Sequence, residues 1–409
     1  MPRIKTKYQP LYTSKKRYFI LTGGRGSGKT FAVIDYIIRL LEQKGQGVLF
    51  TRYTMTSAEK TIIPLFVNYL ETIADINNYH ITKKEIINKR TGAFILFSGI
   101  KTSSGDQTGN LKSLPNITTW VVEEGEDFNK ESAFTDIDDS IRTKGVHNRV
   151  IWIQNPTTRE HFIFKKFFLN SFNYEMINGF KFQRSTHQDV EHIHTTYLDN
   201  LENLDPRKVE QWEELKTVNP SKYEHKYIGA WLDKAEGVIF NNWIEGEFDK
   251  SLPYGYGQDY GFSVDPTTLI KMAVDRKNKL CYWDEMLYTT EKLGTTELSN
   301  KNKRLIDTPK DLIVADSAEG RLIYDLKRSG LNIIQCKKGA GSVSAGITKM
   351  LDYKHIITPR SVNIKKEFNN YIWNDKKSGI PIDDFNHAID AGRYIFGKLT
   401  TRNTSSLIV

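Results

Sequence analysis

The chain has 409 residues, of which 39% are apolar and 12% aromatic, so long disordered stretches are excluded and two folded domains are expected. Its 58 Lys and Arg against 49 Asp and Glu give a net charge of +9, which suits a polyanionic partner but also an ordinary soluble protein. Two cysteines exclude a disulfide framework, and the lack of an eighteen-residue apolar run predicts no membrane association, so we expect a reducing, cytoplasmic setting.

The first predicted elements are a strand, a glycine-rich loop and a helix. Residues 17–21 are β-rich, and apolar residues recur at helical spacing from Ile34 to Leu41. The loop between them has the P-loop pattern, in which backbone N–H groups surround phosphate oxygens, a lysine reaches the β and γ phosphates and a hydroxyl ligates Mg²⁺. These positions are Gly23, Gly24, Arg25, Gly26, Ser27, Gly28, Lys29 and Thr30. The pattern predicts a site for ATP with Mg²⁺; the alternative is a glycine-rich turn with a chance lysine.

A second buried strand, residues 118–122, ends in two carboxylates. A P-loop site needs an acid of this kind to orient its metal, so Glu123 is expected on the Mg²⁺ shell and Glu124 beside the attacking water. Asp-Glu is the more frequent pair, and the longer Glu123 would reach the metal through water. The alternative is a solvated acidic turn that also includes Glu126 and Asp127.

The next β-rich run, residues 150–153, ends in Gln154-Asn155-Pro156. An amide at this strand tip, Asn155, is placed to sense the γ-phosphate. Hydrolysis also needs a guanidinium on the transition-state charge, and Arg25 or Arg142 could supply it in cis or from a neighbouring subunit. Both could instead be surface ion-pair partners. Gln9-Pro10 is a candidate cap for an adenine ring.

The pattern loosens at residues 233–237 and again at 246–253, which predicts a first domain over 1–235, a linker over 236–252 and a second domain over 253–409. Three strands in antiparallel order are expected at 254–260, 269–274 and 280–286. A buried strand at 312–315 and a helix at 322–326 follow. This order predicts a ribonuclease H-like fold.

Three acids are distributed over this second domain: Asp259 in its first strand, Asp316 after the strand at 312–315, and Asp390 in the last helix. His387 lies three residues before Asp390 and projects from the same helical face. Converging carboxylates favour two Mg²⁺ or Mn²⁺ ions, which would run phosphodiester hydrolysis, with His387 as a further ligand or a proton shuttle. Alternatively, each Asp is a polar strand end or an ion-pair partner.

Residues 337–347 join two lysines, a glycine turn and a serine that opens a helix. Lys337, Lys338 and Ser342 are therefore candidate contacts for a DNA phosphate. A solvent-exposed loop is the alternative.

The combined order resembles the terminase large subunits of tailed bacteriophages, over residues 15–396. The residues that carry the likeness are 23–30, 121–124, 154–156, Asp259, Asp316, 338–347 and 386–391. The resemblance implies an α/β protein with a P-loop ATPase domain of the additional-strand (ASCE) type and then a ribonuclease H-like nuclease domain. By position, Glu124 matches the family's hydrolytic glutamate, and Arg142 lies roughly where some relatives place a trans-acting arginine.

The resemblance also implies partners and a place of action. These are double-stranded DNA, a viral portal protein, a small terminase subunit and a ring of identical subunits, docked on the procapsid in the host cytoplasm and absent from the mature virion. Two alternatives remain from the residues themselves. One is a helicase-like ATPase whose second half binds nucleic acid without cutting it; the other is a transposase-like enzyme, which does not explain the P-loop.

Overall fold

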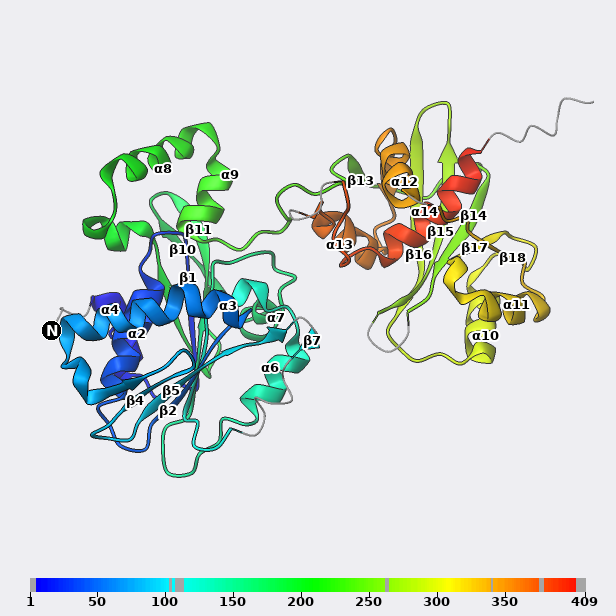
Figure 1. Ribbon diagram of the computed structural model, residues 1–409. Coiled ribbons are helices and arrows are strands. Elements are labelled where there is room, and N and C mark those ends of the chain that lie inside the picture. The colour runs from blue at the N-terminus through cyan, green and yellow to red at the C-terminus, as the bar shows by residue number, and fades with distance from the viewer. Residues whose placement is uncertain are drawn as a thin grey trace, which may run out of the picture. The chain divides into compact units, whose positions relative to one another are not determined.

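The computed structural model describes residues 5–102, 105–106, 114–261, 265–339, 341–374 and 379–401. The chain forms two compact units, Met1–Asp233 and Lys234–Val409 (Figure 1). Within the described ranges, no helix has the length and apolar character that crossing a membrane requires.

The first unit contains an eight-stranded sheet in the order β12-β1-β9-β8-β2-β5-β4-β3. Its parallel strands are β12 (Val190–Thr195), β1 (Tyr18–Gly23), β9 (Arg149–Ile153), β8 (Thr119–Val122), β2 (Gly47–Arg52) and β5 (Phe94–Gly99); β4 (Glu85–Asn88) and β3 (Tyr79–Ile81) complete it antiparallel. The P-loop strand β1 is separated from the acid-bearing β8 by β9. This insertion confirms the additional-strand arrangement.

Both faces of this sheet are covered by helices because its strands are apolar on both sides. Leu21 and Val121 pack with α2 (Lys29–Leu40) and α4 (Ile63–Ile73). Trp120 and Trp152 pack on the other face with α6 (Glu131–Asp138) and α7 (Phe162–Phe167). Since all these parallel strands run the same way, the residues that follow β1, β8 and β9 meet at one edge.

A smaller layer of the first unit lies against the P-loop. It contains the hairpin β10 (Phe172–Ile177) and β11 (Phe180–Ser185), followed by α8 (Pro206–Val218) and α9 (Pro220–Tyr223) (Figure 1). The Arg25 backbone N–H donates to the carbonyl oxygen of Lys226 at 2.9 Å. A Cβ on Gly24 would lie 2.1 Å from the carbonyl oxygen of Tyr227, so only glycine fits there. The loop is therefore held from outside as well as by β1. The shorter elements are α1 (Pro10–Thr13), α3 (Met55–Ser57), β6 (Lys101–Thr102) and β7 (Gly105–Asp106).

The second unit has a seven-stranded sheet in the order β13-β19-β16-β15-β14-β17-β18. The strands are β13 (Trp243–Glu245), β19 (Lys354–Ile357), β16 (Leu280–Thr289), β15 (Thr267–Asp275), β14 (Tyr254–Asp259), β17 (Ile313–Ala315) and β18 (Ile333–Gln335). The predicted antiparallel order of β14, β15 and β16 is confirmed. The interval 236–252 differs from a free linker, because β13 within it pairs with β19.

Helices cover both faces of this second sheet as well. On one face pack α12 (Ser342–Leu351), α13 (Val362–Asn370) and α14 (His387–Thr400); on the other pack α10 (Thr295–Leu305) and α11 (Gly320–Arg328) (Figure 1). The last helix, α14, lies directly on β14. A Cβ on Gly257 would stand only 1.8 Å from the Ala391 carbonyl oxygen, so glycine permits this approach.

Candidate active sites

The first candidate site is the P-loop after β1. The Lys29 side chain is buried, and its Nζ donates to the carbonyl oxygens of Gly23 (3.0 Å) and Gly24 (3.2 Å) and to Asn155 Oδ1 (3.1 Å). Burial lowers the pKa of Lys29 to about 8, although the charges of Glu126 and Glu123 oppose the change. The ammonium group thus lies at the centre of the loop, next to the strand tip that carries Asn155.

Thr30 and Glu123 form a pair that fits a divalent cation. Thr30 Oγ1 donates to Glu123 Oε1 at 2.7 Å, whereas the buried Glu123 Oε2 has no hydrogen-bond partner. Burial raises the pKa of Glu123 to about 7; the Thr30 bond and Lys29 oppose this, and the Glu126 and Glu124 charges add to it. A hydroxyl beside an unpartnered carboxylate oxygen is the donor set that Mg²⁺ takes in such loops. The solvated-turn alternative is wrong for Glu123.

Glu124 is engaged by an arginine that the sequence interpretation missed. Arg52, the last residue of β2, donates its Nε to Glu124 Oε2 at 2.7 Å and its second guanidinium nitrogen to Oε1. Glu124 itself has a φ of 54°, an uncommon left-handed conformation for a residue other than glycine. Its carboxylate is therefore fixed in direction.

Asn155 connects the P-loop lysine to a third acid. Its Oδ1 accepts from Lys29, and its Nδ2 donates to Glu126 Oε1 at 2.8 Å. The Asn155 backbone N–H also donates to Glu126 Oε2 at 3.2 Å. Glu126, which sequence analysis assigned only to an acidic turn, thus positions the β9 strand tip.

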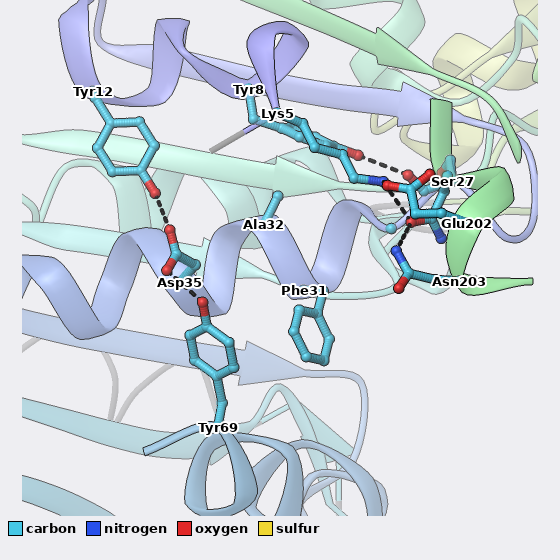
Figure 2. A pocket seen from close by; sticks show the side chains of 12 residues that line it. Lys5, Tyr8, Tyr12, Ser27, Phe31, Ala32, Asp35, Tyr69, Glu202 and Asn203 are labelled. Atoms are coloured by element: carbon cyan, nitrogen blue, oxygen red, sulfur yellow. Dashed lines mark hydrogen bonds and ion pairs between the residues drawn. The ribbon is translucent and has the colours of Figure 1, made fainter. Parts of the chain in front are cut away.

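Two adjoining pockets surround the loop. One, of about 440 Å³, is lined by the P-loop together with Glu123, Glu124, Glu126, Asn155 and Asn200. The other, of about 570 Å³, shares Ser27, Gly28, Phe31 and Asn200 with it and is otherwise lined by Lys5, Tyr8, Tyr12, Ala32, Asp35, Tyr69, Glu202 and Asn203 (Figure 2). The phosphate loop therefore opens into a second, partly aromatic chamber.

The aromatic chamber is organised by Asp35. Figure 2 shows the hydroxyls of Tyr12 and Tyr69 pointing at this carboxylate, each at 2.6 Å. The Phe31 ring, 51% exposed, lies edge-on to Tyr69 with centroids 5.1 Å apart. Gln9 is exposed and does not line the chamber, whereas Tyr8 and Tyr12, on either side of Gln9-Pro10, do.

The two candidate arginines lie in different places. Arg25 is exposed and lines the phosphate pocket. Arg17, directly before β1, donates to the backbone carbonyl of Ile141, the residue before Arg142. Arg142 therefore lies near the beginning of β1, whereas the P-loop follows the end of that strand. A cis role for Arg142 is contradicted by this geometry.

The second candidate site is the acid cluster of the second unit. β14 and β17 are parallel with Gln258 opposite Ala315, which puts Asp259 and Asp316 side by side at adjacent strand ends. The pKa of Tyr394 on α14 is raised first by burial and then by the charges of Asp390, Asp259 and Asp316. The Tyr394 hydroxyl lies 3.5 Å from Asp259 Oδ1, and its ring lies 5.7 Å from the Lys338 ammonium that pairs with Asp316, so both strand-end acids lie close to the helix that carries Asp390.

Each of these acids has a cationic partner. Lys338 pairs with Asp316, Arg393 with Asp390 at 3.0 Å, and His387 Nδ1 with Asp259 Oδ2 at 3.1 Å. In this arrangement no three acid, His or Cys side chains of the described residues are gathered tightly enough to hold a metal ion. Burial nevertheless raises the pKa of Asp390; Arg393 opposes this, and the Asp259 charge adds to it. Carboxylates and an imidazole suit Mg²⁺ or Mn²⁺ in donor type.

His387 begins α14 and has a carboxylate on both ring nitrogens. Its Nε2 lies 3.7 Å from Asp265 Oδ1, opposite the Asp259 contact. Burial lowers the pKa of His387, but the Asp259 hydrogen bond and the charges of Asp259, Glu367 and Asp265 outweigh burial and leave it above its usual value. The imidazole is held where it can carry a proton.

Two further residues support this cluster without any sequence signal. The buried Glu367 of α13 accepts the backbone N–H groups of Ala388 (3.1 Å) and Ile389 (2.9 Å), and so fixes the first turn of α14. The Tyr260 hydroxyl is buried without a hydrogen-bond partner, and the charges of Asp316, Glu319 and Asp259 add to burial in raising its pKa. Glu367 and Tyr260 can be identified only from their contacts in the folded structure.

The predicted phosphate-binding segment lies at the same edge of the sheet. Lys337 is exposed, Lys338 reaches Asp316, and Ser342 begins α12 after Gly341 in the left-handed conformation. Ala340 lies outside the described residues.

Known protein families match the two parts of the chain separately. The family described as phage terminase large subunit matches residues 15–230, and the terminase RNase H-like domain matches residues 259–398. The terminase large subunit of Bacillus phage SPP1 is 29% identical over 93% of this chain and 91% of its own length. The PBSX phage terminase large subunit of Bacillus subtilis strain 168 is 23% identical over 91% and 88%, respectively.

Two solved structures are also similar. The large terminase from a thermophilic bacteriophage covers 97% of this chain and 99% of its own, at 17% identity and a TM-score of 0.45. The SPP1 large terminase nuclease domain with bound Mn covers 39% of this chain and 98% of its own, at 32% identity and a TM-score of 0.34.

Proposed function

This chain belongs to the phage terminase large subunits, with an ATPase domain followed by a ribonuclease H-like domain, and we propose that it hydrolyses ATP to move double-stranded DNA into a procapsid and cuts that DNA. The observation that carries the ATPase half is the unpartnered Glu123 Oε2 beside Thr30, within a pocket centred on Lys29. A site that binds only a small anion would have no use for this buried carboxylate.

The ATPase roles follow from where each group lies. Backbone N–H groups of residues 23–28 and the Lys29 ammonium would hold the phosphates, and Thr30 with Glu123 would hold the accompanying Mg²⁺, which would supply charge neutralisation for the phosphates. Glu124 orients the attacking water once Arg52 releases it. Asn155 and Glu126 sense whether the γ-phosphate is present.

The aromatic chamber accepts the nucleoside. Phe31 offers a partly exposed ring in edge-on contact with Tyr69, and the Tyr12–Asp35–Tyr69 hydrogen bonds hold Tyr69 in place. A rigid aromatic surface stacks a base at low entropic cost.

In the nuclease half, Asp259, Asp316 and Asp390 would hold two Mg²⁺ or Mn²⁺ ions, which supply an activated water and stabilise the leaving oxygen. His387 lies between Asp259 and Asp265, where it can hold a proton and act as a proton shuttle in DNA cleavage. Lys337, Lys338 and Ser342 bind a DNA phosphate.

The motor assembles as a ring on the viral portal with a small terminase subunit, in the host cytoplasm and outside the mature virion. Arg25 supplies the guanidinium within its own subunit, or Arg142 supplies it to a neighbour. A packaging motor advances regardless of sequence, so its DNA contacts are mainly to phosphates and weaken with salt.

The test is a separation of the two activities. Lys29→Ala or Glu124→Gln should abolish ATP hydrolysis and leave Mn²⁺-dependent plasmid cleavage intact, and Asp316→Ala should do the reverse. Wild-type cleavage by both Asp259→Ala and Asp316→Ala would refute the nuclease assignment. No cleavage by the wild-type protein at millimolar Mn²⁺ would favour the helicase-like alternative.

A further inference from the structure

The exposed side of α11 joins two arginines and a tyrosine on one narrow face. Arg321, Tyr324 and Arg328 follow at spacings of three and four residues, which places them in one row along the helix. The opposite side is apolar, with Ile323 and Leu326 in the core beneath the sheet. Packing therefore fixes the direction in which the row points.

No ion pair in the described part of the chain engages the arginines of this row. Neither Arg321 nor Arg328 has an ion-pair partner there, whereas Lys271, Arg360 and Arg393 of the same unit each pair with a carboxylate. Asp325 is the one acid of α11, and the helix also carries the exposed Lys327. The helix surface is thus net positive.

The aromatic member of the row is unusually accessible. Tyr324 is 60% exposed, and the Arg328 guanidinium carbon lies 5.9 Å from its ring centroid. A guanidinium beside an open ring matches a sugar–phosphate backbone, since arginine forks bind phosphate oxygens and the ring can contact the sugar.

The row starts at the acid cluster. Arg321 lies five residues after Asp316, and only the 3₁₀ helix Ser317–Glu319 and Gly320 separate the two residues. Lys337 follows the neighbouring strand β18 at the same edge. A backbone that crosses α11 would lead to the carboxylates.

We propose that the Arg321–Tyr324–Arg328 face of α11 is the surface on which one strand of duplex DNA lies as it enters the nuclease site. This inference rests on the proposed nuclease function and adds the path of its substrate. Being built from phosphate and sugar contacts, the surface binds DNA without sequence preference.

The test uses the full chain with Arg321→Ala/Arg328→Ala. The matched control is Lys250→Ala/Lys277→Ala, which also removes two exposed cations. Lys250 precedes β14 and Lys277 lies in the turn between β15 and β16, so both lie near the end of β14 that is opposite Asp259. Plasmid cleavage with Mn²⁺ gives the half-saturating DNA concentration and the maximal rate. Anisotropy of a duplex of about 30 bp with Ca²⁺ gives the salt dependence of binding.

The α11 variant should need about tenfold more DNA for half-saturation at an unchanged maximal rate, and loss of two phosphate contacts should flatten the salt slope by about 1.8. Arg321→Lys/Arg328→Lys should recover most of the affinity. An unchanged half-saturation and slope, or an equal loss in the control, would overturn the proposal. If the wild-type protein does not cut DNA, the nuclease function fails, but the anisotropy result still decides the α11 surface.

Discussion

Replacing Gly257 by alanine should separate the two activities through sterics alone. The new Cβ would lie 1.8 Å from the Ala391 carbonyl oxygen, and the closest common C···O contacts are about 3.3 Å, so α14 must move by about 1.5 Å. Overpacking of this kind costs about 1–3 kcal/mol of folding free energy. Because Asp390 directly precedes Ala391, a misplacement of about 1 Å predicts about 100-fold slower DNA cleavage. ATP hydrolysis by the first unit should not change.

Gly255 provides the matched control on the same face of β14. A Cβ there would meet the Ile395 Cδ1 at 2.7 Å, the end of a flexible side chain that can turn away. Gly255→Ala should therefore lose less than about 1 kcal/mol and cleave within about threefold of wild type. Urea unfolding and Mn²⁺-dependent plasmid cleavage measure both quantities. Equal effects of the two substitutions, or normal cleavage by Gly257→Ala, would show that the α14 backbone contact does not set the position of Asp390.

Three further outcomes are expected. Glu123→Gln should raise the Mg²⁺ concentration for half-maximal ATP hydrolysis at least tenfold and leave nuclease activity unchanged; an unaltered Mg²⁺ titration would contradict the pairing with Thr30. Phe31→Ala should raise KM for ATP by about 2- to 10-fold, the worth of one aromatic stacking contact, whereas an unchanged KM in steady-state assays would remove the base from this chamber. Burial lowers the pKa of His355 to about 4, so as the pH falls this imidazole is protonated in the unfolded chain before it is protonated in the folded one. The stability from neutral His355 is complete above about pH 6.5 and is lost towards pH 4, up to about 3 kcal/mol; His355→Gln should flatten that part of the urea-unfolding profile, and an identical profile would refute it.

The parts of the fold that sequence predicts well depend on local patterns. The P-loop, the Glu123–Glu124 strand end and the antiparallel start of the second sheet are each encoded by a few adjacent residues. The residues after these strands lie close together because the carboxyl ends of parallel strands meet at one edge of a sheet. The same rule correctly brings Asp259 beside Asp316.

The missed residues act across long separations along the chain. Arg52 reaches Glu124 from another strand, and Asn200, 174 residues further along the chain, donates to the Gly26 carbonyl at 2.9 Å. Neither has a local signature, since an arginine at a strand end and an asparagine in a short 3₁₀ helix are both common. The strand within the predicted linker has no local signature for a related reason: β13 is short, and only its pairing with β19 makes it a strand.

The cations of the nuclease cluster link metal binding to DNA binding. Lys338 cannot pair with Asp316 and with a DNA phosphate through the same ammonium contacts. A carboxylate at this site does not stay unpaired without cost, so Lys338 can leave Asp316 only when another cation takes its place. Arg393 stands in the same relation to Asp390, because it holds that carboxylate through both Nε and a terminal nitrogen. We infer that Lys338 and Arg393 keep the acids compensated until metal binds, and that the departure of Lys338 then frees a positive charge beside Asp316 for an incoming DNA phosphate.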